Sequence, residues 1–196
     1  SEQFVDAADA DYRIAGAYGS DRSGSSVAGG GDIDGDGLSD VLIGAPQNPD
    51  GGVRAGAVYV VFGSSLGDEQ NLDLYLDADH QLLGENDNDY AGQTVANAGD
   101  VDGDGLDDIV LGSRYLKHAD GTQTGGVYVV LARDLGDEVA ISLSEADQKI
   151  LGEESGDDAG NAVSGGGDFN GDGLDDVIVG AYYGESGGMT YLLFGE

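Results

Sequence analysis

The chain contains no cysteine or tryptophan, two prolines, two histidines, and only seven basic residues against 39 acidic ones. Without cysteine there is no disulfide framework, and Cys–His catalysis and cysteine metal centres are excluded. With so few cations the chain has no basic patch to neutralise phosphates, which argues against nucleic acid as a partner. Since no apolar run approaches the length of a transmembrane helix, we expect no membrane insertion. No signal peptide is visible either, and we expect a mature or excised sequence.

Acidic residues give the chain a formal charge of −32 at pH 7, with 30 aspartates and nine glutamates. Three bound divalent cations would cancel only six of these charges, so metal sites alone do not explain the acidity. Such a surface suits a high-salt or marine setting, where ions screen self-repulsion, and it equally suits a generic secreted protein. An apolar content of 39% argues against disorder, and 37 glycines indicate many tight turns.

An acidic nine-residue loop occurs three times, at residues 32–40, 100–108 and 168–176, each copy starting 68 residues after the one before. At an effective dielectric constant near 20, a pair of like charges about 4 Å apart costs on the order of 4 kcal/mol, and a hard divalent cation removes that cost. Ca²⁺ takes six to eight oxygen ligands, whereas Mg²⁺ demands stricter octahedral geometry. Glycines at positions 4 and 6 let the backbone turn tightly. We therefore expect three Ca²⁺ sites per chain.

Positions 1, 3, 5 and 9 of each loop offer side-chain oxygens, and position 7 offers a backbone carbonyl. The candidate ligands are Asp32, Asp34, Asp36, Leu38 and Asp40; Asp100, Asp102, Asp104, Leu106 and Asp108; and Asp168, Asn170, Asp172, Leu174 and Asp176. Because Asn170 is neutral, we expect the third site to bind calcium more weakly. The leucine side chains at position 7 are expected to pack into the core.

An EF-hand shares the opening pattern of this loop but needs a bidentate glutamate at position 12 and flanking helices. Position 12 is Ile43, Leu111 or Val179, within a short β-branched run closed by glycine. The pattern therefore predicts a strand–loop–strand turn. Extracellular modules bind calcium at about 10⁻⁴–10⁻³ M, a level found outside cells, so we expect a secreted or cell-surface protein.

The 68-residue period predicts a repeat protein, and its length is at the long end for a propeller blade. Each unit reads as four short strands, which predicts an all-β fold of β-propeller blades with four antiparallel strands. The expected strands are residues 26–28, 94–96 and 162–164; 41–43, 109–111 and 177–179; 56–62, 126–131 and 189–194; and 72–76 and 139–143. The small residues of the first strand suit the crowded centre of a ring. The expected units are residues 14–81, 82–149 and 150–196, with residues 1–13 as the closing strand of a neighbouring blade.

The chain resembles the FG-GAP repeats of the integrin α-chain β-propeller and its bacterial relatives. The matching residues are Ser23-Gly24, Gly31-Asp32 and the run 40–46, with their counterparts 68 and 136 residues later. The first position of the "FG" pair is not aromatic in any repeat, and only the first repeat keeps "GAP", which suggests altered packing between blades. The resemblance implies that the calcium loops share one face and that partners bind the opposite face or the rim.

Three blades cannot close a ring, because propellers typically have four to eight. The segment 4–7 aligns with the fourth-strand region at 72–75, while the chain stops after the third strand of its last unit. We therefore expect a homodimer, in which each chain donates a strand to the other and a six-bladed ring results. The alternative is a fragment of a longer propeller.

Catalytic residues are not apparent, and we expect no enzymatic activity. His80 and His118 do not recur between the units, and no G-x-S-x-G motif is present. The loop with Arg114, Tyr115, Lys117 and His118 holds two of the seven basic residues and one of the two histidines, and it is a candidate partner contact. We expect a calcium-stabilised extracellular module for adhesion or protein or surface interaction, with an unknown protein or glycan ligand. The alternatives are an accessory domain of a secreted polysaccharide- or lipid-acting enzyme and a purely structural self-assembling module.

Overall fold

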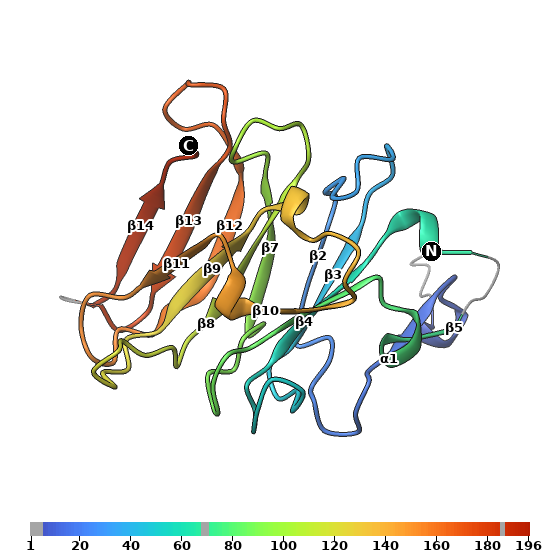
Figure 1. Ribbon diagram of the computed structural model, residues 1–196, viewed down its shortest axis with the longest axis horizontal. Coiled ribbons are helices and arrows are strands. Elements are labelled where there is room, and N and C mark those ends of the chain that lie inside the picture. Colours follow the sequence, from blue (N-terminus) through green and yellow to red (C-terminus); the bar gives the residue numbers. More distant parts are fainter. Residues whose placement is uncertain (1–5, 68–70, 185–186) are drawn as a thin grey trace, which may run out of the picture.

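Three main sheets, built largely of antiparallel pairs, stand side by side in the computed structural model, which describes residues 6–67, 71–184 and 187–196 (Figure 1). The first sheet has the strand order β10-β6-β4-β3-β2, the second β11-β9-β8-β7 and the third β12-β13-β14. The strands are β2 (Ser26–Gly29), β3 (Val41–Ala45), β4 (Ala57–Val61), β6 (His80–Leu83), β7 (Thr94–Gly99), β8 (Asp108–Ser113), β9 (Gly126–Val130), β10 (Ala140–Ser142), β11 (Gln148–Leu151), β12 (Ala159–Gly167), β13 (Asp176–Ala181) and β14 (Met189–Leu193). This all-β architecture, with one sheet per repeat, fits a β-propeller.

The first three strands of each repeat lie where the sequence predicts them, because each is a short run of small or β-branched residues between glycine turns. The prediction of the fourth strand was wrong. The strands that pair antiparallel with β4 and β9 are β6 and β11, which begin eight and nine residues after the starts of the expected segments. The expected segments and the observed strands β6 and β11 are all short and partly apolar, so local sequence suits a strand in either place and only long-range pairing decides between them.

The expected fourth-strand segments instead run back to the preceding sheet. β10 pairs in parallel with β6, and β5 (Asn71–Asp73) pairs in the same way with β1 (Arg13–Ala15). Each is followed by a short helical turn, α1 (Leu74–Asp77) or the 3₁₀ turn η4 (Leu143–Glu145), whose first leucine is buried. The remaining 3₁₀ turns are η1 (Ala7–Asp9), η2 (Gly63–Ser65) and η3 (Ala132–Asp134). We call the segments 71–77 and 140–145 the clasps, since each ties one repeat to its neighbour.

Apolar clusters fill the spaces between neighbouring sheets. Leu42 and Val60 of the first sheet pack with Ile109 and Leu111 of the second, and Leu143 of the clasp lies in the same cluster. A second cluster joins the second and third sheets, and a third cluster lies between the first sheet and the segment around β1 and α1. The hydrophobic effect therefore acts mainly between blades rather than within them.

Close backbone contact joins the blades near their inner strands. A Cβ atom at Gly44 would lie 2.1 Å from the carbonyl oxygen of Gly92, and one at Gly112 would lie 2.0 Å from that of Gly160. Gly92 and Gly160 have positive φ angles, both +79°, which favour glycine. The glycine near the end of the second strand of one repeat therefore lies against the backbone of the glycine just before the first strand of the next repeat. The small inner strands expected at the crowded centre are present as β2, β7 and β12, which contact one another in turn.

Candidate metal centre

Each acidic loop connects the first strand of a sheet to the second, and neighbouring loops lie side by side. The amide of Asp107 donates to the carbonyl of Asp32 at 3.1 Å, and the amide of Asp175 donates to the carbonyl of Asp100 at 2.9 Å. The loops therefore form one row along one face of the three sheets, in the order of the repeats.

The aspartate at position 9 of each loop ties the loop to the sheet behind it. Both oxygens of Asp40 accept backbone amides, from Ile33 at 2.7 Å and from Gly63, after β4, at 2.8 Å. Equivalent pairs of hydrogen bonds reach the carboxylates of Asp108 and Asp176. In each of the three repeats, the position-9 carboxylate thus fixes the start of the loop against the end of the third strand.

Carboxylates at positions 1, 3 and 9 converge in the first two loops. In each group, one ligand oxygen per residue lies within 4.8 Å of the others, and the groups are Asp32, Asp34 and Asp40, and Asp100, Asp102 and Asp108. The donors are all carboxylate oxygens, the ligand type that Ca²⁺ and Mg²⁺ prefer. The position-5 acids Asp36 and Asp104 are not members of these groups, and each accepts the amide of the leucine at position 7. Their role as ligands stays a prediction.

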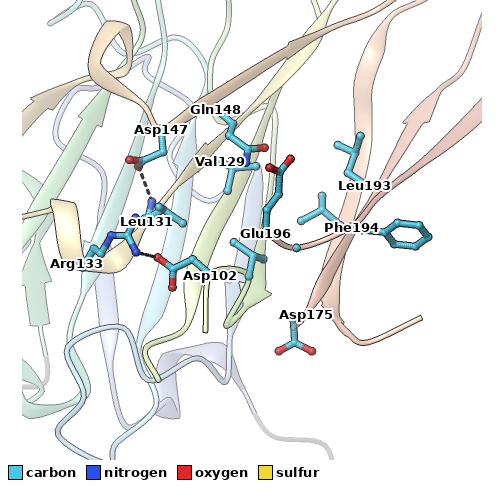
Figure 2. A pocket seen from close by; sticks show the side chains of 13 residues that line it. Asp102, Val129, Leu131, Arg133, Asp147, Gln148, Asp175, Leu193, Phe194 and Glu196 are labelled. Carbon is cyan, nitrogen blue, oxygen red and sulfur yellow. Dashed lines mark hydrogen bonds and ion pairs between the residues drawn. The ribbon is translucent and has the colours of Figure 1, made fainter. Parts of the chain in front are cut away.

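One polar atom in the row suggests a missing positive charge. Oδ1 of Asp32 is buried and has no hydrogen-bond partner among the described residues. In the second loop, by contrast, Oδ2 of Asp102 forms an ion pair with the guanidinium of Arg133. Figure 2 shows this pair at the wall of a cavity of about 330 Å³ between the second and third sheets. A buried carboxylate oxygen without a partner is costly, and a cation bound beside it would remove that cost.

The third loop follows the same hydrogen-bond pattern with one charge fewer. Asp168 accepts the amides of Gly171, Asp172 and Gly173, and Asn170 accepts the amide of Asp172 at 2.9 Å. These backbone donors, that of Gly173 first, lower the pKa of Asp168. The loop thus holds the same shape without the third acid, and its weaker affinity for calcium stays a prediction.

Burial raises the pKa of the position-9 acids where the loop is most enclosed. The pKa of Asp108 rises to about 6 and that of Asp40 rises as well, in both cases chiefly because burial disfavours the charged carboxylate. The two backbone amides at each carboxylate act in the opposite direction. A cation beside these oxygens would favour the ionised form.

The acid at position 8 was missed by the sequence analysis. Oδ2 of Asp107 accepts the amide of Asp32 at 2.8 Å, and Oδ2 of Asp175 accepts the amide of Asp100 at 3.0 Å. Each position-8 carboxylate therefore holds the first residue of the preceding loop. The available signal was the acid at this position in the second and third loops, where the first loop has Ser39.

The leucines at position 7 pack between loops in two of the three repeats. Leu106 packs against the core, and its Cδ2 atom would lie 2.8 Å from a Cβ at Gly35. Leu174 covers Gly103 in the same way, with a distance of 2.9 Å. The expectation of core packing was wrong for Leu38, which is 50% exposed.

In the candidate partner loop, the cationic side chains contact acidic and aromatic residues of the same chain. The guanidinium of Arg114 lies 4.4 Å from the ring centroid of Tyr115 and 3.9 Å from the carboxylate of Asp158. Lys117 lies 3.9 Å from the buried Asp89. His118 contacts the carbonyl of Gly152, and His80 contacts that of Glu138 in a different part of the fold. The two histidines are not brought together, and the partner contact of this loop stays a prediction.

Repeated blades with a row of acidic loops along one face define this chain as an integrin-like repeat protein of the β-propeller type. The family model described as FG-GAP repeat matches residues 23–61, 91–130 and 159–193. The chain belongs to the FG-GAP repeat family.

Curated relatives with this similarity are integrin alpha chains. The chain is 31% identical to Integrin alpha-4 of Xenopus laevis over 79% of its length, and 32% identical to Integrin alpha-PS2 of Drosophila melanogaster over 77%. It is 32% identical to Integrin alpha pat-2 of Caenorhabditis elegans over 91% of its length. It spans only 11–14% of these relatives. These comparisons do not support an accessory domain of an enzyme. Among the described residues, no helix is both long and apolar enough to traverse a bilayer.

Proposed function

We propose that the three acidic loops each bind Ca²⁺ and that the cations stabilise an extracellular module for adhesion or for protein or surface interaction. The observation that carries the calcium sites is the convergence of positions 1, 3 and 9 within 4.8 Å, repeated in two loops. The buried, unpartnered oxygen of Asp32 supports a cation there. Family membership supports the adhesive role, because the relatives are integrin alpha chains.

Calcium would act on the structure through the row of loops. Asp40, which would hold the cation, also accepts backbone amides from its own loop and from the end of the third strand. The backbone amide of Asp32, another candidate ligand, donates to Asp107 of the neighbouring loop. A cation that neutralises their mutual repulsion therefore stabilises the boundary between blades as well as the loop itself. Asp36, Asp104 and Asp172 would complete the ligand set, together with the carbonyls of the position-7 leucines.

The chemistry of the chain suits recognition rather than catalysis. Its rigid sheets carry long connections between the second and third strands, on the face opposite the acidic loops, and loops on rigid scaffolds are where binding residues concentrate. The partner would be a protein or a glycan, and the location would be outside the cell or at its surface. We propose no enzymatic activity.

Calcium binding is tested with Asp34→Ala and Asp104→Ala, each titrated with CaCl₂ and with MgCl₂ by isothermal calorimetry. We expect the loss of about one site per chain in each variant, and a lower melting temperature than the unaltered chain in calcium but not in EDTA. Asp137→Ala removes an exposed acid outside the loops and serves as the control. Normal calcium binding and melting by either loop variant would show that the ligand assignment is wrong.

The adhesive role needs a separate test. The protein is applied to a glycan array and to an array of extracellular matrix proteins, in 2 mM calcium (about the extracellular level) and in EDTA. Binding that is specific and is lost in EDTA supports the proposal. An absence of binding on both arrays contradicts adhesion and leaves the calcium sites untouched.

A further inference from the structure

We propose that Arg133 is a built-in counter-ion of the second acidic loop, so that this loop binds Ca²⁺ more weakly than the first loop and keeps its shape better when no cation is bound. This role of Arg133 rests on the proposed calcium sites, because it sets the affinity of one of them. Two differences between the first and second loops point to it. Among the described residues only the second loop has an ion pair at position 3, and the first aspartate of each loop is hydrogen-bonded differently.

Arg133 is placed beside the second loop by the turn η3, which follows β9. This turn is held on both sides, since the amide of Ala132 donates to the buried carboxylate of Asp108 at 2.9 Å and Leu135 packs in the apolar cluster between the first and second sheets. From the turn, the guanidinium reaches Oδ2 of Asp102, the position-3 acid (Figure 2). Both residues of the ion pair belong to the second repeat, which has a described repeat on each side.

The acidic partner in this ion pair is enclosed. The side chain of Asp102 is 6% exposed, whereas that of Arg133 is 50% exposed. A carboxylate with so little contact with water needs a positive partner to stay charged, and an arginine stays protonated throughout the physiological pH range. Asp134 also lies near the guanidinium, 3.4 Å from its Nε, but the side chain of Asp134 is 56% exposed and such surface pairs are weak. The second loop therefore has a cation of the chain itself at position 3.

The first loop has no such cation. Gly63 and Ala132 each donate to the position-9 carboxylate of their own loop, so the turns η2 and η3 correspond residue by residue. Ser64 therefore stands where the second repeat has Arg133. Ser64 is neutral, Asp34 at position 3 is exposed, and no ion pair of the described residues reaches Asp34. The charge at position 3 of the first loop is thus left for a bound cation to neutralise.

The aspartate at position 1 differs between the two loops in the same sense. In the second loop, Oδ1 of Asp100 accepts the amide of Gly103 at 2.7 Å and Oδ2 accepts the amide of Gly105 at 3.0 Å. In the first loop, Oδ2 of Asp32 accepts the amide of Gly37 at 3.0 Å, but its buried Oδ1 has no hydrogen-bond partner among the described residues. The second loop therefore satisfies its own acids at positions 1 and 3, whereas the first loop leaves a buried oxygen for a cation.

The two loops are matched in the acids that belong to them. Each has aspartates at positions 1, 3, 5 and 9, and each is contacted by one position-8 carboxylate of the loop that follows. At the first loop, Asp107 accepts the amide of Asp32 at 2.8 Å. At the second loop, Asp175 accepts the amide of Asp100 at 3.0 Å. The ion pair with Arg133 is therefore what distinguishes the charge of the second loop from that of the first.

A positive charge at this place lowers the affinity of the second loop for calcium. The affinity of such loops rises with the negative charge of their ligands, and Arg133 offsets the charge of Asp102. The guanidinium also repels a cation held by the other oxygen of the same carboxylate. A single positive charge about 6 Å from a doubly charged ion, at a dielectric constant of about 80, lowers the affinity about ten-fold. The second loop should therefore bind Ca²⁺ more weakly than the first.

The same charge stabilises the second loop when calcium is withdrawn. Repulsion between the aspartates of an empty loop opposes its folded shape, and Arg133 relieves that repulsion at Asp102. Arg133 therefore favours the empty loop over the loaded one. By linkage, the factor by which its removal raises the affinity for calcium equals the factor by which its removal destabilises the empty loop relative to the loaded loop.

The experiment exchanges the two corresponding residues. Arg133→Ser gives the second turn the residue of the first, and Ser64→Arg does the reverse. Each variant and the unaltered chain are titrated with CaCl₂ by isothermal calorimetry, and their melting temperatures are measured in EDTA and in saturating calcium. The calorimetric transition that Asp104→Ala removes identifies the second loop, and the one that Asp34→Ala removes identifies the first.

Two control variants separate the ion pair from other effects. Arg133→Lys keeps a positive charge at the same place. Arg54→Ser removes an exposed arginine from the connection between β3 and β4, and it changes the net charge of the chain by the same amount as Arg133→Ser.

We expect Arg133→Ser to raise the calcium affinity of the second loop about ten-fold, and Ser64→Arg to lower that of the first loop. Arg133→Ser should also lower the melting temperature more in EDTA than in saturating calcium. Both control variants should keep the affinity of the second loop within about two-fold of its value in the unaltered chain, because distant surface charges are screened and lysine preserves the charge.

An unchanged or lower affinity of the second loop in Arg133→Ser would overturn the role of Arg133, and so would an equal gain in Arg54→Ser. If Arg133→Ser does not fold, an unchanged affinity of the first loop in Ser64→Arg overturns the role instead. An unaltered chain that gives no heat of calcium binding would contradict the proposed calcium sites themselves, so the two failures are distinguishable.

Discussion

Oδ2 of Asp107 accepts a hydrogen bond from the backbone amide of Asp32 at 2.8 Å, across the boundary between the first and second sheets. The same contact joins Asp175 to Asp100 at the next boundary. Neighbouring acidic loops are therefore joined by hydrogen bonds, and we expect a substitution in one loop to change the stability of the next.

The position-8 contact predicts a loss of stability on Asp107→Ala. We expect the free energy of unfolding to fall by about 1–3 kcal/mol, because a hydrogen bond to a charged acceptor is lost and the amide of Asp32 loses its partner. Chemical denaturation in calcium measures this. Ser39→Ala, at the exposed equivalent position, is the control and should change stability by less than about 0.5 kcal/mol in the monomeric chain. Equal effects of the two substitutions would contradict the coupling between loops.

The neutral Asn170 predicts a gain in calcium affinity on Asn170→Asp. A third carboxylate would join Asp168 and Asp176, and affinity in such loops rises with ligand charge. We expect the weakest of the three calorimetric transitions to shift several-fold toward tighter binding, while the other two stay unchanged. An unchanged third transition would show that position 3 of this loop does not contact the cation.

The clasp predicts a large effect of Leu143→Ala. Leu143 is 2% exposed and lies in the apolar cluster between the first and second sheets. Its truncation should cost about 2–5 kcal/mol, because a buried leucine is replaced by a cavity. Leu76→Ala alters a side chain that is 75% exposed in the equivalent clasp and is the matched control. A small effect of Leu143→Ala in urea unfolding would show that the clasp does not stabilise the boundary.

The buried Asp89 predicts a pH-dependent difference between the chain and Asp89→Asn. Burial raises the pKa of Asp89, chiefly by disfavouring its charge, and it is 1% exposed. As pH falls toward the raised pKa, the folded state takes up the proton before the unfolded state does, so this group favours folding more at lower pH. The stability of the unaltered chain relative to Asp89→Asn should therefore rise between pH 7 and pH 5.

Thermal unfolding at both pH values, in the same calcium concentration, measures this difference. Lys117, 3.9 Å from Asp89, is present in both proteins. A difference that is constant with pH, or that falls toward pH 5, would contradict the raised pKa.

The sequence predicted those parts of the fold that depend on local chemistry. Strands β2, β3 and β4 and their counterparts lie at the expected residues, because short β-branched runs between glycines have few alternatives. The acidic loops lie between the first and second strands, as their flanking residues indicated. The fourth strand was misplaced, because the clasp and β6 are both short apolar segments and only long-range pairing separates them.

The candidate site, too, was predicted from the sequence only in part. Positions 1, 3 and 9 were predicted from their acids, and the structure groups them in two loops. The structural roles of Asp40 and Asp107 were not predicted, because their partners Gly63 and Asp32 lie 23 and 75 residues away along the chain. Side-chain to backbone contacts at such separations leave no periodic signal in the sequence.

By itself, the sequence determined the repeat and the acidic loops, because each depends on residues close together in the chain; the type of cation stays a prediction. Only the tertiary structure decided which strand completes each sheet, how neighbouring loops are joined, and where apolar faces and strand edges are left open. Those features depend on contacts between repeats, where the hydrophobic effect and buried hydrogen bonds act over distances that sequence spacing does not encode.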